Sequence, residues 1–595
     1  VEESGLIKFD FLGLRTLTVI NNAVKSIEKI EPDFKLKSIP FDDKKVFQLL
    51  KSGKTKGIFQ LESRGMVDVV KRMKPENFSD IIALVALYRP GPMESGMLDQ
   101  YIKRKLGKSE VTVQHPALRK ILNETYGVFV YQEQVMEAAQ VLASYSLGDA
   151  DNLRRAMGKK KADVMEQEKG TFVKGCEQNK INAQKAEEIF ENIETFAGYG
   201  FNKSHSAAYA YLAYQTAYLK THFTAHFLAS VLTSEQDKTD KLEPHIKDCE
   251  VMKVKIIPPN INSSKDTFLV NKDNCIEYSL AALKNVGRKF VQDLCEEREK
   301  GEFKSMMDLA SRVDLRKGGK RALESMAKAG VFDNFCGRNE AISMILKVLE
   351  ASDQIHSSKE TGVVDMFGDV NQVDISGYEI YEFTESELLN KELECFGYYF
   401  SQHPLTTIRN SISSRTKPIN KLQVSSQEKF LPVLIHKKRI RQKGSQVSIW
   451  LEVSDETGNL DVSIPRELHD NKKELFKENS IVMLKGKFSH DDFREDVRIR
   501  MRASDIMSIE DSRNHLTTKL CLEIDRANMK KIGNGQFPEL KELESAEGVD
   551  VFIRISDEEL NLSSEFKVDN FKISLEDSTF EKLNKLFGEE KYKLY

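Results

Sequence analysis

The sequence predicts a multidomain protein of the α+β class. Its 595 residues exceed what one hydrophobic core supports, and this length indicates roughly four domains. Most segments before residue 425 have the apolar spacing of helices, whereas 430–511 has short strands of alternating polarity. A hydrophobic content of 40% and a charged content of 30% are ordinary for a globular chain.

The charge and the cysteines of the sequence indicate which kinds of binding site can be expected. The net charge of −3 does not by itself indicate a nucleic-acid binder, yet basic clusters at Lys103–Lys108, Arg154–Lys161 and Lys437–Lys443 could line a basic channel. The seven cysteines lie far apart without metal-ligand spacing, so we expect reduced thiols in a cytoplasmic protein and no zinc site. The sequence has no apolar run of about 18 residues, so no membrane span is expected.

The chain opens on a strand-like segment, Gly5–Leu14, in which apolar residues alternate with Lys8 and Asp10. This alternation places the two charged side chains together on the outer face of a half-buried strand. Such a pair could hold a metal ion and a phosphate, or could form an ordinary solvated face. Because the chain starts directly on this strand with Val1 and no Met, we expect it to lack an N-terminal part.

Three further segments, between residues 57 and 136, start with apolar residues and continue into polar ones. Gly57–Met66 and Tyr126–Met136 each predict a short strand that runs into a helix. The second of these helices is expected to start at 132–134, which reads Gln-Glu-Gln. Ile81–Met93 predicts an apolar helix that is stopped by prolines, with Arg89 at the stop, where a cation can cap a helix end.

A basic stretch, NLRRAMGKKK, follows at 152–161. We expect Arg154 and Arg155 directly after a helix, with Gly158 in a tight turn. Adjacent guanidinium groups fit phosphate oxygens, so a phosphate contact and an exposed basic helix end are both open interpretations. Asp149 and Asp151 have the spacing of a metal-binding pair, but we expect them in a loop and discount them as ligands.

The segment Phe196–Phe223 predicts a glycine-rich turn and then a helix. The helix is expected to start near Lys203 and His205, with Ser204 or Ser206 as its N-cap. Free backbone amides at such a start favour an anion. Aromatic residues then recur along one helix face, which is more typical of a core than of a base-stacking surface; they are Tyr211, Tyr214, Tyr218 and His222.

The segment Tyr278–Glu297 predicts two helices joined by a turn at Gly287, with Lys284 and Asn285 beside it. This hairpin could present amides to DNA phosphates without reading sequence, or could be an ordinary helical hairpin. Leu309–Asp333 repeats the pattern more weakly.

A linker is expected at Ser352–Asp374, because this stretch is rich in small and polar residues. Inside it, Asp365, Met366 and Phe367 form a short motif that could dock into a groove on a partner or could anchor the linker locally.

Regular strands at 430–511 predict a small β-barrel of the OB type. Its basic segment and its tryptophan would give positive charge and one stacking group for DNA; these residues are Lys437, Lys438, Arg439 and Trp450. The remainder, 515–595, predicts a separate α/β domain with acidic patches.

Six stretches in chain order resemble one family. KFDFLGLRTLT, FQLESRGM, LVALYRPGPM, YGVFVYQEQVM, LRRAMGKKK and FAGYGFNKSHSAAYA closely resemble the C-family of bacterial replicative DNA polymerases, the DNA polymerase III alpha subunits. The resemblance implies the end of a palm (1–25), fingers (26–270), a helix-hairpin-helix and clamp-binding region (271–425), an OB-fold (426–512) and a domain like those that bind the clamp loader (513–595).

The resemblance also implies an activity and its residues. Asp10 matches the last of three palm carboxylates that hold two Mg²⁺ ions, and Lys8 matches a lysine near the incoming triphosphate. Arg154 and Arg155 match finger arginines that grip this triphosphate. Further finger candidates for nucleotide binding are Arg89, Lys203 and His205. Implied substrates and partners are primer–template DNA, dNTPs, a sliding clamp, a clamp-loader subunit and a separate proofreading exonuclease.

The sequence departs from the family in several places. The other two carboxylates, an upstream DxD pair, and the N-terminal phosphoesterase-like domain are absent from it, so this chain alone is expected to be inactive in nucleotidyl transfer. Val363 stands where the clamp peptide usually has Gln, and Thr224 stands where a proline often ends the fingers helix, which is therefore expected to run on. The alternative function is a non-catalytic DNA-binding scaffold that links the sliding clamp to the clamp loader.

Overall fold

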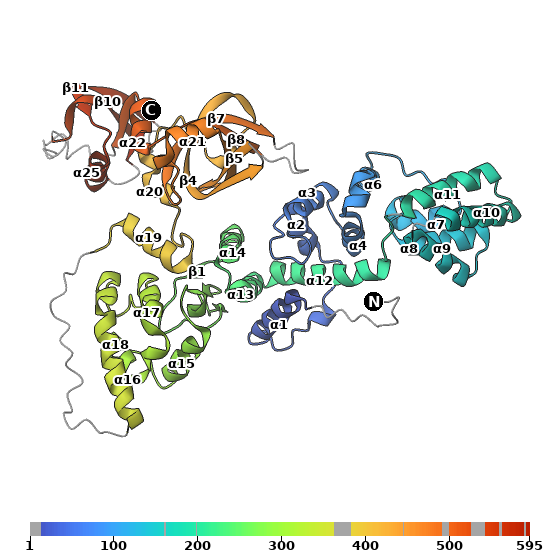
Figure 1. Ribbon diagram of the computed structural model, residues 1–595, viewed down its shortest axis with the longest axis horizontal. Coiled ribbons are helices and arrows are strands. Elements are labelled where there is room, and N and C mark those ends of the chain that lie inside the picture. The colour runs from blue at the N-terminus through green and yellow to red at the C-terminus, as the bar shows by residue number, and fades with distance from the viewer. Residues whose placement is uncertain are drawn as a thin grey trace. The chain divides into compact units, whose positions relative to one another are not determined.

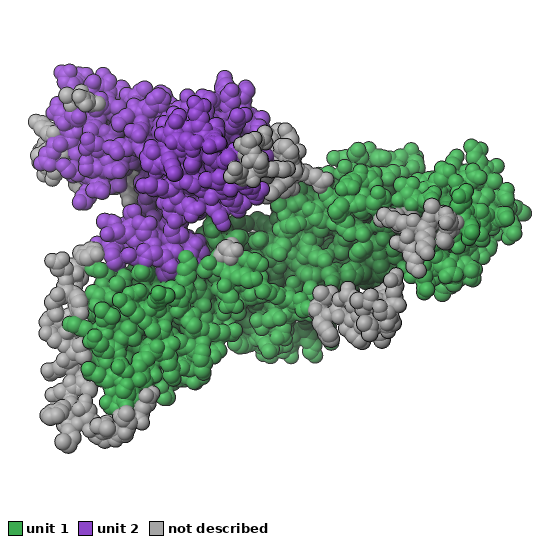
Figure 2. All heavy atoms as spheres, in the orientation of Figure 1, with its two compact units in different colours: residues 1–380 green, residues 381–595 purple. Residues whose placement is uncertain are grey.

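The computed structural model describes residues 13–159, 162–197, 199–361, 382–443, 446–490, 499–524, 542–557, 562–587 and 591–595. The chain divides into two compact units, Val1–Ile380 and Tyr381–Tyr595 (Figure 2). The first unit is largely helical and the second is built mainly on sheets. The predicted α+β class with several domains is therefore confirmed. No helix within the described ranges is long and apolar enough to cross a membrane.

The first unit begins with a long series of helices (Figure 1). They are α1 (Arg15–Ile27), α2 (Lys44–Ser52), α3 (Arg64–Met73), α4 (Phe78–Leu87), α5 (Pro90–Glu94), α6 (Met97–Lys105), α7 (Leu118–Leu122), α8 (Gln132–Ala143), α9 (Leu147–Lys159), α10 (Ala162–Gln178), α11 (Ala183–Ala197), α12 (Lys203–His222), α13 (Thr224–Glu235) and α14 (Thr239–Val251).

Most of these helices pack around two hydrophobic cores. The first core joins α2, α3, α4 and α6 to the long helix α12, and the second core lies among α7 to α11 (Figure 1). Helix α4 is buried along most of its length and is closed at its start by a capping box between Asn77 and Asp80. Tyr214 of α12 is fully buried and donates its hydroxyl hydrogen to the carbonyl oxygen of Pro40 at 2.6 Å. The expected packing role of the aromatic stripe on α12 is therefore confirmed for this residue.

Two of the predicted strands in this region are wrong. The segment at 57–62 forms turns, because Gly57 and Gln60 adopt positive φ angles of 75° and 59° and so interrupt an extended run. The segment before α8 is extended, but it pairs with another segment only through a single bridge between Tyr131 and Phe201. The predicted start of α8 at Gln132 is confirmed.

Two predicted helix ends also differ from the structure. Pro90 does not only stop α4; it begins α5, because a proline is compatible with the first position of a helix. The helix α12 does not run on past Thr224, because Phe223 leaves the helical conformation with φ −130° and ψ 50°. Thr224 then starts α13, and its hydroxyl donates to the carbonyl oxygen of Lys220 at 2.8 Å.

A small sheet and a second helical group complete the first unit. The sheet contains β1 (Ile256–Ile257), β2 (Leu269–Val270) and β3 (Ile276–Glu277), in the order β1-β3-β2. The helices that follow are α15 (Arg288–Arg298), α16 (Met306–Arg312), α17 (Gly319–Lys328) and α18 (Arg338–Thr361).

Two expectations in this group need correction. Only a 3-10 turn at Leu280–Ala282, rather than a helix, precedes the turn before α15. The first part of the predicted linker, up to Thr361, is helical and forms the end of α18. Within this helix, Ser352 is fully buried, and its hydroxyl accepts a hydrogen bond from the amide of Leu315. The rest of that linker lies outside the described residues.

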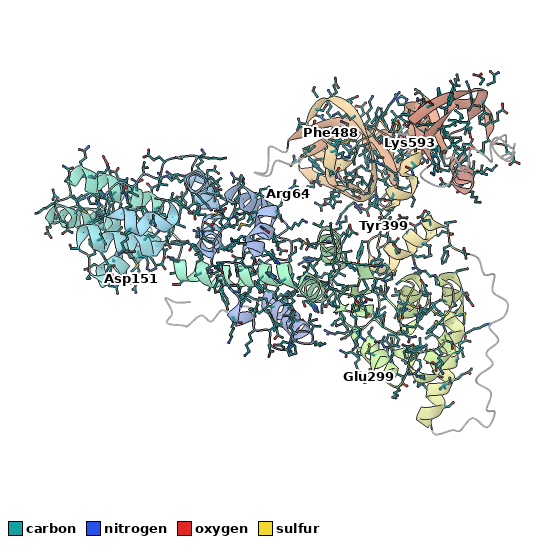
Figure 3. All side chains as sticks on the ribbon, turned by 180° about the vertical axis from the view of Figure 1, so that it is seen from behind. Arg64, Asp151, Glu299, Tyr399, Phe488 and Lys593 are labelled. Atoms are coloured by element: carbon teal, nitrogen blue, oxygen red, sulfur yellow. The ribbon has the colours of Figure 1, made fainter. Side chains whose placement is uncertain are left out.

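The second unit contains a closed five-stranded barrel (Figure 1). Two helices, α19 (Glu385–Phe396) and α20 (Pro404–Ile408), precede it. Its strands are β4 (Ser425–Lys443), β5 (Gln446–Asp455), β6 (Gly458–Ile464), β7 (Ile481–His490) and β8 (Ile499–Met507), and α21 (Arg466–Asn471) lies between β6 and β7 in sequence. Neighbouring strands follow the order β4-β5-β6-β8-β7. The predicted β-barrel is present, and Phe488, labelled in Figure 3, belongs to its core.

The chain ends in a four-stranded sheet of order β11-β10-β9-β12. Its elements are α22 (Ile509–Leu516), β9 (Lys519–Ile524), β10 (Glu544–Asp557), β11 (Leu562–Ile573), α25 (Asp577–Phe587) and β12 (Tyr592–Leu594). Arg513 of α22 is buried and connects two parts of the unit, since its guanidinium donates to Ser411 and to Asp577. This contact fixes α25 beside the segment that leads into the barrel.

Candidate functional site

Two segments that are far apart in sequence meet at the start of α12. Tyr131 and Phe201 form a parallel bridge. The amide of Gln132 donates to the carbonyl oxygen of Phe201 at 3.0 Å, and the amide of Phe201 donates to the carbonyl oxygen of Val130 at 3.3 Å. The motif stretches YGVFVYQEQVM and FAGYGFNKSHSAAYA are therefore joined backbone to backbone where the two cores of the first unit meet.

A third motif stretch joins them through Arg89. Its Nε donates to the carbonyl oxygen of Ala86 at 2.8 Å, and its Nη2 donates to the carbonyl oxygen of Tyr199 at 2.8 Å. The guanidinium also lies over the ring of Phe201, 4.1 Å from its centre. Burial lowers the pKa of this guanidinium. Two of the N–H donors of Arg89 are thus used by backbone carbonyl oxygens. Nucleotide binding by Arg89 stays a prediction.

Tyr199 packs against the proline-rich end of the same motif. A Cβ atom placed on Gly91 would lie 2.1 Å from the Tyr199 ring, closer than side chains tolerate. Gly91 is therefore required for space rather than for an unusual φ angle. Tyr199 also lines a cavity of about 450 Å³ together with Met97, Phe129 and Phe196.

The anion site predicted at the start of α12 stays a prediction, and the N-cap of this helix is not the expected serine. Asn202 is the N-cap, and its Oδ1 accepts a hydrogen bond from the amide of His205 at 2.8 Å. Ser204 and Ser206 lie inside the helix. Within the described residues the amide of Ser204 has no protein acceptor. An amide of this kind at a helix start can receive an anion.

Two glutamates contact this helix start, and the sequence reasoning assigned no role to either. The carboxylate of Glu133 accepts from the amide of Lys203 at 3.1 and 2.9 Å and from Nδ2 of Asn202 at 2.8 Å. The ammonium of Lys203 donates to Glu124 at 2.6 Å. The only signal for Glu133 in the sequence is its place in the first turn of α8.

His205 lies beside this arrangement without an ion pair among the described residues. Its ring stacks on Tyr209 with centres 4.3 Å apart and meets the edge of Phe201 at 5.3 Å. Lys203 and His205 therefore both stand in the first turn of α12, but their side chains contact different partners, Glu124 for Lys203 and the Phe201 and Tyr209 rings for His205.

The arginine pair lies within α9, not after a helix as expected. Nε of Arg154 and Nε of Arg155 each contact Asp151 at 2.8 Å, and hydrogen bonding to Arg154 is the main cause that lowers the pKa of Asp151. Asp151, labelled in Figure 3, thus orients both arginines rather than lying in a loop. Asp149 also belongs to α9 and accepts a hydrogen bond from the hydroxyl of Ser146 at its start.

The catalytic and clamp-binding candidates cannot be placed. Lys8 and Asp10 lie outside the described residues, as do Asp365, Met366 and Phe367. The part of the chain that the structure describes contains no group of three or more His, Cys, Asp or Glu residues that could hold a metal ion.

The turn before α15 presents polar residues at the surface. Lys284, Asn285 and Gly287 are exposed, whereas Val286 between them is buried. Asn285, rather than Gly287, adopts the left-handed conformation, with φ 65°. A Cβ atom at Gly287 would meet open space.

The barrel gathers cationic and aromatic side chains on one part of its outer surface. Arg439 on β4 lies directly opposite Trp450 on β5, so the two share a face. The guanidinium of Arg500 lies 5.2 Å from the centre of the Trp450 ring, and Arg439 also pairs with Glu452. The neighbours of Trp450 on β5, Ile449 and Leu451, point into the barrel core.

The other basic residues predicted on β4 lie close to this face. Lys437 is exposed and Lys438 is half-buried, and the amide of Lys438 donates to Glu478 at 3.1 Å. The structure thus brings Lys437, Arg439 and Trp450 to one face of the barrel and adds Arg500, which the sequence reasoning did not identify. Lys438 lies opposite Leu451, a core residue, and therefore does not share that face.

The sequence of this chain was compared with protein families and with known proteins. Residues 16–180 match the bacterial DNA polymerase III alpha subunit finger domain, and residues 253–341 match a helix-hairpin-helix motif. DNA polymerase III subunit alpha of Haemophilus influenzae is 40% identical over 565 residues, which cover 91% of this chain and 48% of that protein. The same subunit of Escherichia coli K12 is 39% identical over 546 residues, covering 88% of this chain and 47% of the relative.

A third relative matches the entire chain. DNA polymerase III subunit alpha of Vibrio cholerae is 36% identical over 620 residues, covering 100% of this chain and 53% of that protein. The chain spans about half the length of the curated relatives that it matches. The chain therefore belongs to the family of bacterial DNA polymerase III alpha subunits.

Proposed function

We propose that the chain acts in template-directed DNA synthesis as part of a replicative DNA-directed DNA polymerase. The observation that carries this proposal is the meeting of three motif stretches at the start of α12, where Arg89 holds the carbonyl oxygen of Tyr199 and Glu133 holds the amide of Lys203. Rigid support of this kind is what a binding site for an incoming nucleotide requires. The names of the relatives support the same activity.

The nucleotide is proposed to bind through its phosphates. The first turn of α12 offers the Ser204 amide, the positive end of the helix dipole and the side chain of Lys203. Arg154 and Arg155 share one carboxylate, Asp151, so the positive charge of the pair is only partly neutralised. Their guanidinium groups suit the oxygens of a triphosphate. His205 and Arg89 stay candidates for the same role.

The chemistry would require residues outside the described part. Asp10 would hold Mg²⁺, which when bound activates the primer 3′-hydroxyl and stabilises the leaving pyrophosphate. Lys8 would lie near the triphosphate. The division into palm (1–25), fingers (26–270), hairpin region (271–425), barrel (426–512) and final domain (513–595) belongs to the same proposal.

Primer–template DNA is proposed to bind at two places. The turn at Lys284, Asn285 and Gly287 would receive backbone phosphates, as the match of 253–341 to a helix-hairpin-helix motif suggests. The barrel would bind a single strand on the face of Trp450. Its strand order β4-β5-β6-β8-β7, with α21 between β6 and β7, supports an OB-type fold.

Protein partners are proposed from the family alone. Asp365, Met366 and Phe367 would contact a sliding clamp, and 513–595 would contact a clamp-loader subunit; a separate exonuclease would proofread. Changing Met366 and Phe367 together to Ala should weaken binding of the chain to the clamp. Unchanged binding in surface plasmon resonance would assign the contact to another segment.

The activity is tested with a chimaera. The part of the Haemophilus influenzae relative that precedes the matched region is placed before Val1, and extension of a labelled primer is followed. We expect extension by the chimaera and none after Asp10→Asn, with primer–template binding retained. Extension by the variant at the parent rate would show that Asp10 is not a metal ligand. A chimaera that binds DNA but never extends it would favour the alternative, a DNA-binding scaffold.

A further inference from the structure

We propose that Glu133 is a positioning residue, which holds the first turn of α12 in the arrangement that presents Lys203 and His205 to the nucleotide. The inference rests on the proposed function, because it assigns a supporting residue to that nucleotide site. Glu133 would not touch the nucleotide itself. It would act through the backbone of α12 and through the cap residue Asn202.

The first argument is the set of groups that Glu133 contacts. Both of its carboxylate oxygens accept from the amide of Lys203, at 3.1 and 2.9 Å, and one also accepts from Nδ2 of Asn202 at 2.8 Å. These donors belong to the helix start and its cap rather than to a mobile side-chain tip. A carboxylate at this position also faces the positive end of the helix dipole. The interaction therefore fixes the backbone of the helix start.

The second argument is a relay through Asn202. Its amide has a donor end and an acceptor end, and both ends are used. The Nδ2 group donates to Glu133, and this contact orients Oδ1 toward the amide of His205, from which it accepts at 2.8 Å. Removing the carboxylate would leave the Asn202 side chain free to turn, and the cap on His205 would weaken.

The third argument is that Glu133 joins the two cores. It stands in the first turn of α8, a helix whose Val135, Ala138 and Leu142 belong to the second core. Helix α12 packs into the first core through Tyr214 and its neighbours. The backbone bridge between Tyr131 and Phe201 lies directly beside this contact. Glu133 therefore fixes the nucleotide-facing end of α12 to the body that also carries Arg154 and Arg155.

The contrast with Glu124 explains why Glu133 is not a competitor for the nucleotide. The pair between Lys203 and Glu124 is exposed, with 38% and 39% of the two side chains accessible. Exposed pairs of this kind contribute at most about 1 kcal/mol, so a polyphosphate can take over the ammonium. Glu133, in contrast, engages backbone and cap groups that the bound nucleotide would not need to displace.

The inference is tested with Glu133→Gln and Glu133→Ala, and Glu137→Gln is the matched control. Glu137 is exposed one turn further along the same helix. Hydrogen–deuterium exchange is measured over a peptide spanning 199–206 in the whole chain. We expect exchange about five- to tenfold faster in both Glu133 variants, the range for loss of a helix cap, and no change in the control. Unchanged exchange in Glu133→Ala would overturn the inference.

A second measurement separates positioning from general stability. Binding of MgdATP and of inorganic tripolyphosphate is measured by equilibrium dialysis, and binding of duplex DNA is measured in parallel. We expect the Glu133 variants to bind both phosphate ligands about five- to tenfold more weakly, with DNA binding unchanged. Stronger binding of tripolyphosphate by the variants would overturn the inference, since the Glu133 carboxylate would then compete with the phosphate for the same donors.

The two hypotheses fail in different ways. If the unmodified chain binds neither phosphate ligand, the proposed nucleotide site is wrong, while the exchange experiment still decides whether Glu133 holds the start of α12. If the chain binds nucleotide and the Glu133 variants bind it equally well, the nucleotide site stands and the positioning role is wrong. Urea unfolding of each variant checks that the first unit is folded.

Discussion

Lys220 and Asp248 form an ion pair that is shut off from water. Nζ of Lys220, on α12, lies 2.7 Å from a carboxylate oxygen of Asp248, on α14, and the Lys220 side chain has no accessible surface. Nζ also donates to the carbonyl oxygen of Lys56 at 2.7 Å. Desolvation is the largest cause acting on both groups, and it lowers the pKa of Lys220 and raises the pKa of Asp248. The pair joins α12, α14 and the loop before α3.

Removing one member of this pair should destabilise the first unit strongly. Lys220→Met leaves the Asp248 carboxylate buried without its partner, so we expect a loss of about 3–5 kcal/mol in the free energy of unfolding. The double variant Lys220→Met, Asp248→Leu should recover most of that loss, because no charge is then left in the interior. Urea unfolding measures both.

A surface pair provides the control. Lys185 and Glu188 lie 2.5 Å apart with 40% and 47% of their side chains accessible, so Lys185→Met should change stability by less than about 1 kcal/mol. Equal losses for Lys220→Met and Lys185→Met would contradict the buried character of the inner pair.

The stability of the first unit should fall as the pH drops, because of His245. Burial, with smaller effects from Lys56, Lys220 and Lys241, lowers the pKa of His245 to about 4 from 6.5. The folded state therefore keeps the ring neutral, while the unfolded state takes up a proton below pH 6.5. This effect should cost about 3 kcal/mol between pH 6.5 and pH 4, and unfolding measured across that range tests it.

The variant His245→Leu should flatten the acid side of this profile. Among the residues that the structure describes, Nδ1 of His245 is buried without a hydrogen-bond partner, so removal of the ring breaks no hydrogen bond at this atom. A His245→Leu profile parallel to that of the unmodified chain would show that other groups cause the pH dependence.

Gly91→Ala should disturb the junction at α12 through Tyr199. The added methyl group would meet the tyrosine ring at 2.1 Å, and overpacking of this kind costs about 1–3 kcal/mol. Adding Tyr199→Ala to Gly91→Ala should remove the clash. Gly170→Ala is the control, since Gly170 lies exposed in α10 with open space around its Cα and should gain about 0.5–1 kcal/mol. A neutral Gly91→Ala would mean that Tyr199 turns away freely.

Trp450→Ala should weaken binding of single-stranded DNA by the barrel. A stacked base contributes about 1–3 kcal/mol, so we expect the affinity for an oligonucleotide, measured by fluorescence anisotropy at low salt, to fall about five- to 150-fold. The melting temperature should change little, because Trp450 lies on the outer face. Ile440→Ala removes an exposed side chain of the barrel, 54% accessible, and should leave the affinity unchanged. Equal affinities for the two variants would place the strand elsewhere.

Local patterns in the sequence predicted elements better than they predicted contacts. The start of α8 at Gln132, the strands of the barrel and the packing of Tyr214 follow from spacing of apolar residues, which acts over one or two turns. The errors arose where competing local signals met. Ser204 and Ser206 are good caps, but Asn202 is the residue that leaves the helix and bonds back to it. Pro90 breaks one helix and begins another.

What the sequence by itself determined is the family, the α+β class and the motif stretches of the candidate site. What only the tertiary structure decided is which of these residues act on one another. Glu133 and Lys203 are 70 positions apart, Arg89 and Tyr199 are 110 apart, and no periodicity links them. Such pairs depend on how α4, α8 and α12 pack around two cores. Packing depends on the whole chain and not on local spacing. For this reason only the structure showed that Arg89 contacts the backbone and that Glu133 contacts the start of α12.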